Sequence, residues 1–566
     1  MTLVLLVPAF LFVAAAIVLV GPDRTRHARA KIAAYPVGIA CLGAVGTLYQ
    51  VASSGPIEIR SYNLSSVASF AIPIGFHVDR LSAIMMTLIT SVSVVIYNYS
   101  VGYMFQDRHA RRYLAMICLT DFVLICMVSS SNLMMLFLFW QILSYLLYVL
   151  AHNHGHPGTL AGAFKTFTLL RVADTAFLAG IALAYQLYGT LEFQELFVRA
   201  AQTPIALSLW PGMEVSGATA ITLLFFVGAM GKSAQFPIHL WLPGSLFAPT
   251  PVHALLHAGI INAGGFLINR LAPLFGLSST TLHVAFVIGT LTAILGATMM
   301  LAQNDIKKTL GFSTIGQMGY MIMECGLGAF SLAVFHLVAH GLFKATVFLN
   351  CGNVIHKARQ EPHFPHVDHQ VDEEELSRLT WFTGFITTLF IPLLILLVTH
   401  GVLRIPLLES QGTVIFLFFI WITSSQAILT LTRLRQVASW KVSSVMLITL
   451  LFIVFVYLFA VESFTAFLYP DPEEVASYFK AAALPDWLFD LMIVMATLLT
   501  VLGWSYLYLR AHGRTIWMPA WIDGVRIRLY VLFMNRLYAD EIYQKLGVIL
   551  LRILDRFDKS AQGWSR

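Results

Sequence analysis

Apolar stretches long enough to cross a lipid bilayer recur along the whole chain. A helix needs about 20 mostly apolar residues to cross the hydrocarbon core. Only 11% of the 566 residues are charged, whereas a soluble protein has roughly 25%. The sequence therefore predicts an all-α polytopic membrane protein with about 15 transmembrane helices, because a helix satisfies its own backbone hydrogen bonds in lipid. The stretches are centred near residues 11, 43, 91, 121, 142, 176, 230, 262, 291, 316, 342, 389, 423, 452 and 498.

Basic residues in the loops predict the orientation of the chain. Lys and Arg are enriched in cytoplasmic loops, and here they follow the odd-numbered stretches. We therefore expect the N-terminus outside and the C-terminus in the cytoplasm. The basic residues that follow the odd-numbered stretches are Arg24, Arg26, Arg29, Lys31, Arg108, Arg111, Arg112, Lys307, Lys308, Lys357, Arg359, Arg378, Arg433, Arg435, Lys441, Arg510 and Arg514.

Two segments are more hydrophilic than the rest. Residues 53–80 are predicted to form an external loop with some strand character. The tail, 515–566, contains apolar residues spaced by three and four with charges between them, which indicates an amphipathic helix on the cytoplasmic surface or on a partner. These apolar residues are Ile542, Leu546, Ile549, Leu550, Ile553, Leu554 and Phe557.

Lys232 is predicted to lie about halfway along its apolar stretch. A bare charge at mid-bilayer costs at least ~2.5–3.5 kcal/mol, so such a residue is a functional candidate. The alternative is a side chain that snorkels to the interface. Gly231 and Pro237 flank the lysine, and proline breaks a helix by removing a hydrogen bond. Because broken helices at this depth line polar cavities, we favour proton handling by Lys232.

A second candidate is a stripe of ionisable residues, His336, His340 and Lys344, spaced i, i+4, i+8. Such neighbours lie roughly 5–6 Å apart on one helix face, and imidazoles titrate near neutral pH. The stripe therefore predicts a proton relay, the alternative being histidines buried in a core. His257 follows the Lys232 stretch and is a candidate link to it, while His253 fits a relay or a core role equally well.

Acids are fewer in the apolar stretches. Asp174 comes one turn after Arg171, so these two residues are either a proton site or a structural pair in which each offsets the burial of the other. Asp121 has no partner nearby in the sequence. We expect it to be protonated or paired across helices with a base such as Lys232, and either state makes it a candidate proton site.

Other motifs suggest no chemistry of the chain's own. Two histidine groups lie in expected cytoplasmic loops, where solvated side chains are favoured over a metal site. The five cysteines lie far apart and indicate neither disulfides nor a metal cluster. Nucleotide-binding, hydrolase and zinc-binding motifs are not found, so we predict no cofactor and no catalytic centre, with energy from an ion gradient or another subunit. The histidines are His152, His154, His156, His363, His366 and His369.

Four long motifs carry a resemblance to a known family. The chain resembles the antiporter-like, proton-conducting subunits of respiratory complex I and Mrp cation antiporters, most strongly over residues 75–360. The resemblance implies two inverted five-helix repeats, each with a broken helix. It assigns Lys232 a conducting role with His257 as partner, and it assigns the central relay to Lys307, His336, His340 and Lys344. The motifs are HVDRLSAIMMTLITSVSVVIYNYSVGYM, GKSAQFPIHLWLPGSLFAPTPVHALLHAGIINAGGFLINR, NDIKKTLGFSTIGQMGYM and FHLVAHGLFKATVFLNCGNVIH.

This resemblance also divides the chain. Helices 1–3 would occupy 1–112, including the external loop. The first repeat would cover 113–272 and a degenerate second repeat 280–436. Two last helices would follow at 437–514, and the cytoplasmic amphipathic tail would fill 515–566.

Three departures from the family narrow the prediction. Gln141 stands where the family has a glutamate that partners the lysine, so Asp121 is the expected replacement, and Asp121→Asn is expected to be more damaging than Gln141→Ala. The twelfth stretch, 379–398, has no ionisable side chain, which leaves the second half-channel without its exit. The tail is also shorter than in complex I subunit L.

A shortened L-like chain of this kind is similar to DabB, the membrane subunit family of the DAB inorganic carbon pumps. The resemblance implies a bacterial inner-membrane subunit whose proton (or Na⁺) flux drives a DabA partner, a cytoplasmic protein that resembles carbonic anhydrase. The first alternative is an ion-translocating subunit of a complex I-like or Mrp-like assembly. A haem-binding membrane redox protein is a second, suggested only by the many histidines.

Overall fold

The computed structural model describes residues 2–20, 26–63, 73–151, 157–210, 212–244, 248–360, 459–511, 520–545 and 548–549. Most of these residues form apolar helices, and two small β-hairpins lie between some of the helices. Up to the first broken helix, the elements are α1 (Thr2–Leu19), α2 (Arg26–Ser54), β1 (Ile57–Asn63), β2 (Pro73–Val78), α3 (Arg80–Tyr103), α4 (Ala110–Val128), α5 (Leu133–Ala151), α6 (Pro157–Tyr188), α7 (Phe193–Gln202), β3 (Ala206–Trp210), β4 (Met213–Ser216) and α8 (Gly217–Lys232).

The second part begins with the short pieces that follow the break. In chain order the elements are η2 (Ile238–Leu240), α9 (Trp241–Gly244), α10 (Thr250–Leu255), η3 (Leu256–Ile260), α11 (Ala263–Arg270), α12 (Ala272–Phe275), α13 (Ser279–Leu301), α14 (Ile306–Gly326), α15 (Phe330–Gln360), α19 (Pro472–Ala482), α20 (Asp486–Ala511), α21 (Ala520–Met534) and η5 (Arg536–Tyr538). A further short apolar helix, Phe459–Leu468, precedes α19.

The helical membrane architecture predicted from the apolar stretches is confirmed for the described residues. Each predicted centre among them lies in a helix, except residue 262, which lies in the turn between η3 and α11. In the described ranges, seven helices are long and apolar enough to cross a membrane, or eight if the bent pair α19–α20 counts as one span. The stretches centred near 389, 423 and 452 lie outside the described residues, so the total of about 15 stays a prediction.

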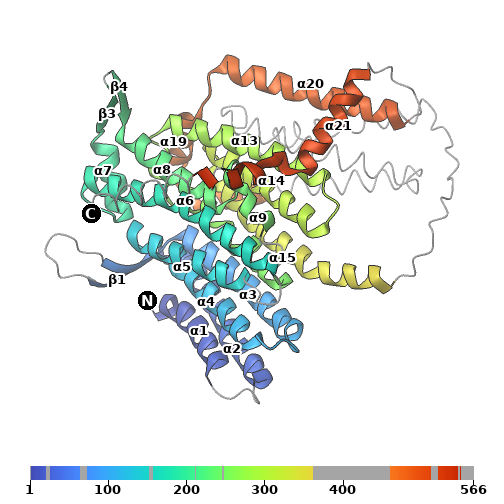
Figure 1. Cartoon of the computed structure of the whole chain (residues 1–566). Helices are drawn as coiled ribbons and strands as arrows, with labels where there is room; N and C mark the ends of the chain where they lie inside the picture. Colours follow the sequence, from blue (N-terminus) through green and yellow to red (C-terminus); the bar gives the residue numbers. More distant parts are fainter. Residues whose placement is uncertain are drawn as a thin grey trace, which may run out of the picture.

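The elements alternate between two ends of the bundle. In Figure 1 the start of α1, β1, the β3–β4 hairpin and α7 lie at one end, and the end of α1 and the start of α2 lie at the other. The loop at 53–80 has the strand character predicted for it, since β1 and β2 pair antiparallel with Ile57 opposite Val78. The β3–β4 hairpin, which precedes α8, was not predicted.

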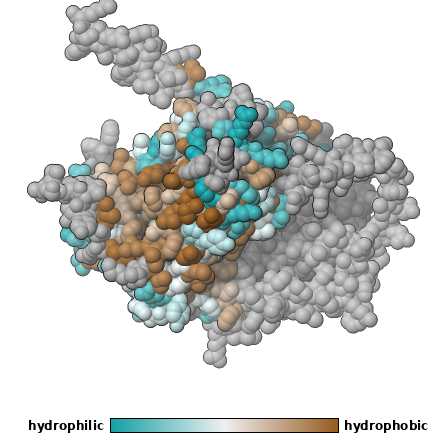
Figure 2. Space-filling model, turned by 90° about the horizontal axis from the view of Figure 1, so that it is seen from below, coloured by the Kyte–Doolittle hydropathy of each residue, from teal (hydrophilic) through white to brown (hydrophobic). Residues whose placement is uncertain are grey.

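Apolar side chains cover part of the outer surface. Figure 2, which looks at the molecule from below the view of Figure 1, shows a broad band of them. On α2, Tyr35, Leu42 and Tyr49 are 74–77% exposed. An apolar surface of this extent is unusual for a soluble monomer and suits contact with lipid.

Among the residues that the structure describes, two helices are broken inside the bundle, and the predicted break at Lys232 is confirmed. Helix α8 ends at Lys232, and Ala234 then adopts a left-handed φ of 48°. The chain resumes as η2 and α9. In the second broken helix, α10 passes into the π-helical turn η3 before α11. Such π-helical turns are frequently found at functional sites, and His257 lies in this one.

Candidate ion-conducting site

Lys232 lies where α8 ends, between α5 and α6, and it has no exposed surface. Its Nζ donates to the Oγ of Ser144 at 2.5 Å and to the backbone oxygen of Trp140 at 3.2 Å. The same Nζ lies 5.1 Å from the centre of the Trp140 ring. These contacts hold the amine inside the bundle, so snorkelling does not describe this lysine.

Asp174 supplies the negative charge at this site. Its Oδ1 accepts a hydrogen bond from the Trp140 indole at 2.5 Å, and its Oδ2 pairs with Arg171 at 2.6 Å. The carboxylate and the Lys232 ammonium attract each other electrostatically. Trp140 therefore bridges the two groups, because its carbonyl accepts from the lysine while its indole donates to the acid. The Arg171–Asp174 pair expected from the sequence is present.

Asp121 is not paired with Lys232, which corrects one of the two states predicted for it. Its carboxyl is 1% exposed, and the side chain that interacts with it is the Ser93 hydroxyl of α3, not Lys232. The reason is helix packing. Asp121 is on α4, which packs against α1, α3 and α5, whereas Lys232 is on α8, which packs along α6. Gln141 lies beside Asp174, and its side-chain amide interacts with the Asp174 carboxylate.

The predicted stripe on α15 faces α14. The His336 Nδ1 lies 3.1 Å from the Oε2 of Glu324, and its Nε2 lies 3.0 Å from the Oε1 of Gln317. The rings of His336 and His340 are 6.3 Å apart. Lys344 donates to the Oγ of Ser313 at 2.9 Å. The three residues therefore lie along one face, as their spacing predicts.

The sequence analysis missed Glu324, a buried acid paired with a histidine of the stripe. The available signal was a lone carboxylate at the end of an apolar stretch, twelve residues before His336. Lys307 lies in the first turn of α14, away from this pair. The charges of Lys307 and Lys344 both act electrostatically on the Cys351 thiol.

His257 belongs with the α15 stripe in this structure. Its ring stacks on Phe348 with centroids 4.3 Å apart and an interplanar angle of 9°. It lies within electrostatic range of Lys344 and His340. His253 packs 6.3 Å from His257 on the same side. No contact between His257 and Lys232 is found in the part of the chain described, although Ser233, next to Lys232, donates to the oxygen of Ile261 in the turn after η3 at 2.8 Å.

Metal binding finds no support within the described ranges, where no group of three or more His, Cys, Asp or Glu side chains could hold an ion. The six loop histidines considered as metal ligands lie outside these ranges. The uncharged stretch 379–398, expected to be the degenerate twelfth helix, also lies outside them. Part of the amphipathic tail, 550–566, does so as well.

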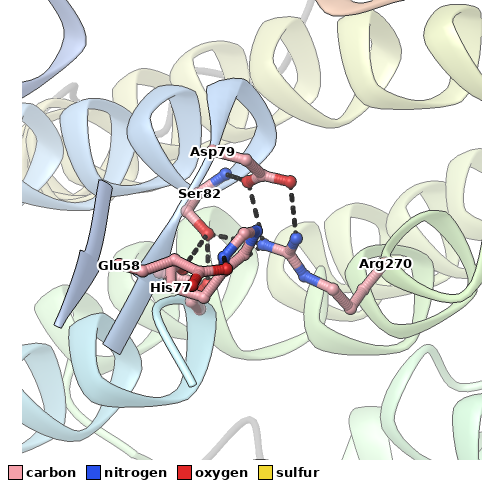
Figure 3. A network of polar contacts seen from close by, with 6 residues as sticks. Glu58, His77, Asp79, Ser82 and Arg270 are labelled. Carbon is pink, nitrogen blue, oxygen red and sulfur yellow. Dashed lines mark hydrogen bonds and ion pairs between the residues drawn. The ribbon is translucent and has the colours of Figure 1, made fainter. Parts of the chain in front are cut away.

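A polar network at the start of α3 was also missed (Figure 3). Asp79 caps α3 by accepting from the backbone N–H of Ser82 at 2.9 Å, and it pairs with Arg270 of α11 at 2.6 Å. The Arg270 Nη2 also donates to the Oγ of Ser82 at 2.5 Å. His77 and Glu58 continue the network across β2 and β1, 3.3 Å apart.

The charge state of Asp79 follows from this network. Burial opposes the ionised form, but the Arg270 guanidinium outweighs it and lowers the pKa of Asp79 from 3.8 to about 2. The Asp79–Arg270 pair joins the end of the second broken helix to the start of α3. Because Asp79 directly follows β2, the pair also fixes the β1–β2 hairpin relative to these two helices.

Comparison with known proteins identifies the family. The model of the NADH:quinone oxidoreductase/Mrp antiporter transmembrane family matches residues 130–427. A second model, the N-terminus of complex I chain 5, matches residues 64–114. The chain belongs to this family. It is 39% identical over 489 residues to a probable inorganic carbon transporter subunit DabB1 of Halothiobacillus neapolitanus, which covers 85% of this chain and 86% of that one.

Other relatives support the same membership. The chain is 35% identical over 342 residues to NADH-quinone oxidoreductase subunit L of Neisseria meningitidis, matching 60% of this chain and 50% of that subunit. It thus aligns with about half the length of that subunit. The fold is similar to a chain of the Mrp complex from a Dietzia species, with a TM-score of 0.54 and 22% identity over all of this chain and 60% of that one.

Proposed function

We propose that this protein is the ion-conducting membrane subunit of an energy-coupled inorganic carbon pump. A cation gradient, of protons or Na⁺, would drive a cytoplasmic DabA-like partner that resembles carbonic anhydrase, and the chain itself would have no catalytic centre. Similarity to DabB1 over most of both chains supports the carbon substrate. The observation that carries ion conduction is the fully buried Lys232 at the end of a broken helix, facing Asp174 across Trp140.

The three charges around Trp140 explain how Lys232 gains and loses a proton inside the bundle. A buried charge is tolerated only when it is paired and hydrogen-bonded. When Lys232 is charged, Asp174, Ser144 and the Trp140 carbonyl stabilise it. When the proton leaves, Asp174 stays paired with Arg171 and the indole. The charges balance when Lys232 is neutral, whereas protonated Lys232 shares the single Asp174 carboxylate with Arg171 and leaves one net positive charge. Asp174 favours binding of the proton and Arg171 favours its release, as a conducting site requires.

The α15 stripe is proposed as the continuation of the path. Glu324 and Gln317 contact His336, His340 follows at 6.3 Å, and Lys344 and His257 lie further along. Water between these groups would complete a chain of proton donors and acceptors. Lys307 would serve the end of this relay. Asp121 would hold a proton at a separate buried position, since a carboxylate there would have the Ser93 hydroxyl but no basic side chain among the described residues to balance its charge.

The architecture expected for the whole chain is part of the proposal. It has about 15 helices, with inverted repeats at 113–272 and 280–436, helices 1–3 before them, two helices at 437–514 and a cytoplasmic tail from 515. The protein would lie in a bacterial inner membrane with its N-terminus in the periplasm. The lack of ionisable residues in 379–398 would leave the second repeat without a complete half-channel.

A second candidate function is ion translocation in a complex I-like or Mrp-like assembly. The similarity to subunit L and the Mrp-like fold favour it. The two functions differ in the partner. Purification of the tagged protein from its own membranes should yield one large zinc-containing partner for a carbon pump, or a set of oxidoreductase or antiporter subunits for the alternative. A Soret band in the purified protein would instead indicate haem.

The test of ion conduction is Lys232→Ala in a host that lacks carbonic anhydrase, with the partner co-expressed. We expect inorganic carbon uptake to fall at least ~100-fold, the scale of losing one proton-transfer group, while the complex still assembles. Lys480→Ala, an exposed lysine on α19, is the matched control and should leave uptake unchanged. Normal uptake by an assembled Lys232→Ala complex would refute the assigned role.

A further inference from the structure

Ser233 follows Lys232 directly and joins the two broken helices. It has no exposed surface, and its Oγ donates to the backbone oxygen of Ile261 at 2.8 Å. Ile261 lies in the turn between η3 and α11. A buried hydrogen bond of this kind is costly to lose, because the oxygen is then left without a partner. The bond therefore fixes the end of α8 to the end of the π-helical turn.

Two glycines leave no space around this bond. A Cβ added at Gly264 of α11 would lie 2.3 Å from the backbone oxygen of Ala229 and 2.4 Å from the Oγ of Ser233. At the residue before Lys232, a Cβ added at Gly231 would lie 2.3 Å from a side-chain atom of α6. Close-packed interiors of this kind transmit small displacements. A shift of the end of α8 that carries the lysine therefore has to be taken up by α11 and the turn before it.

The turn held by Ser233 has the geometry of a π-helix, which is rare in proteins. The N–H of Ile261 donates to the oxygen of Leu256 at 2.9 Å, one residue further back than in an α-helix. His257 lies within this turn and stacks on Phe348 of α15. Ile261 is thus held at its N–H by the turn and at its C=O by Ser233. Moving Ser233 therefore acts directly on the turn that carries His257.

The same turn contacts α15 beside the second candidate site. Asn262 donates from its Nδ2 to the oxygen of Ala258 at 2.8 Å. A Cβ added at Gly341, the neighbour of His340, would lie 3.2 Å from that oxygen and 3.5 Å from the Nδ2. Direct contacts therefore lead from the end of α8 through the π-helical turn to the α15 stripe.

We propose that Ser233 is a positioning residue that couples the Lys232 site to the α15 stripe. Its hydroxyl makes the end of α8 and the π-helical turn shift together, so a change in the contacts of Lys232 alters how His257 packs against α15. This inference rests on the proposed function and deepens it, because it names the link through which proton exchange at the first site affects the second. Coupling of this kind is established by changing one site and measuring the other.

The experiment measures amide hydrogen exchange of residues 256–261 in the complex purified with its partner, since exchange reports local opening. The parent, Lys232→Met, Ser233→Ala and the double variant are compared. We expect Ser233→Ala to speed exchange in this segment about tenfold, as the loss of one buried hydrogen bond would. Lys232→Met should change exchange there at least about fivefold, the low end of coupling between sites. The same substitution should have no effect when Ser233 is already alanine.

Thr222→Val is the matched control for loss of a buried hydroxyl. Thr222 is on the same helix, has no exposed surface and lies 2.7 Å from the Oγ1 of Thr281. The control should leave exchange at 256–261 at the parental rate. Ser233→Cys keeps the shape of the side chain with a weaker donor. It should also speed exchange, and it serves as the test if Ser233→Ala does not assemble.

Two results would overturn the coupling. One is parental exchange at 256–261 in the assembled Ser233 variants, and the other is an equal effect of Lys232→Met with and without the hydroxyl. Proton flux in liposomes, followed with an internal pH dye, separates the two proposals. Ser233→Ala should lower flux about tenfold, the rate equivalent of one buried hydrogen bond. If Lys232→Met conducts like the parent, the proposed function fails, and if it is blocked while exchange at 256–261 never changes, only the coupling fails.

Discussion

Trp140 organises the candidate site at the scale of single residues. Its carbonyl accepts from Lys232, its ring lies 5.1 Å from the ammonium, and its indole donates to Asp174. Breaking a buried charge pair is costly because the remaining charge has no compensation. Position 141, where the resemblance places an acid, is a glutamine here, and the acid that acts on Lys232 in the structure is Asp174 of the next helix, which is paired with Arg171.

The first prediction concerns the rank of the candidate acids. Asp174→Asn should lower carbon uptake more than either Asp121→Asn or Gln141→Ala, because only Asp174 acts on the charge of Lys232. We expect a loss of at least ~10-fold, the size of a lost charge-assisted hydrogen bond of about 1.5–3 kcal/mol. Uptake is compared at equal amounts of assembled complex. A larger loss in Asp121→Asn would instead indicate that Asp121 on α4 is the acid that acts with Lys232.

At the scale of elements, glycine lets α13 and α14 approach closely. A Cβ added at Gly319 would lie 2.4 Å from the backbone nitrogen of Ala293, and one added at Gly296 would lie 2.4 Å from that of Gly316. Small residues bring helix backbones together in membranes, where packing rather than the hydrophobic effect drives association. Helix α8 packs against α13, and α11 and α15 pack against α14, so the spacing of this pair helps to set the positions of all three helices.

Gly319→Ala tests this packing. The added methyl group meets backbone atoms that cannot give way, so the helices must separate, at a cost of roughly 1–3 kcal/mol for overpacking. The melting temperature of the purified complex should fall by several degrees. Gly38→Ala in α2, where a Cβ meets nothing within 4 Å, is the control and should not lower it. An unchanged melting temperature in Gly319→Ala would contradict the close approach.

The Asp79–Arg270 pair predicts a pH dependence of stability. Because the pKa of Asp79 is lowered from 3.8 to about 2, the carboxylate stabilises the fold fully above pH 4, and this contribution is lost as the pH falls toward 2. Its size is roughly 1–2 kcal/mol after allowance for solvent screening, since the side chain is 32% exposed.

Thermal unfolding of Asp79→Asn checks this. The variant should melt at a lower temperature than the parent at pH 7, and the difference should shrink as the pH approaches 2. Glu195→Gln removes the exposed ion pair with Arg199 on α7 and should change the melting temperature little. A difference between Asp79→Asn and the parent that persisted at pH 2 would show that the carboxylate charge is not its source.

At the scale of the whole molecule, the two ends of the bundle predict opposite labelling. The hairpins and the start of α1 share one end (Figure 1), which the basic loops assign to the outside. A membrane-impermeant maleimide added to intact cells should label Ser208→Cys in β3 and should label Gln106→Cys, between α3 and α4, only after the cells are opened. Both positions are exposed. The parent chain, with four buried cysteines and one half-buried, provides the background.

Local sequence determined the helices, the break at Lys232 and the stripe on α15. Apolar length, helix-breaking residues and a spacing of four act within a few turns, so they can be read without knowing the neighbours. The resemblance to the family also rested on contiguous motifs, between residues 75 and 360. Which acid serves Lys232 depends instead on helix packing.

Only the tertiary structure brought Asp174 rather than Asp121 to Lys232, paired Glu324 with His336, packed His257 against α15 and joined Asp540 to Lys165. Each of these contacts joins side chains that belong to two different elements. A side chain's partner in the bundle interior is chosen by the rotation and crossing of whole helices, which summed packing decides and no single stretch of sequence contains.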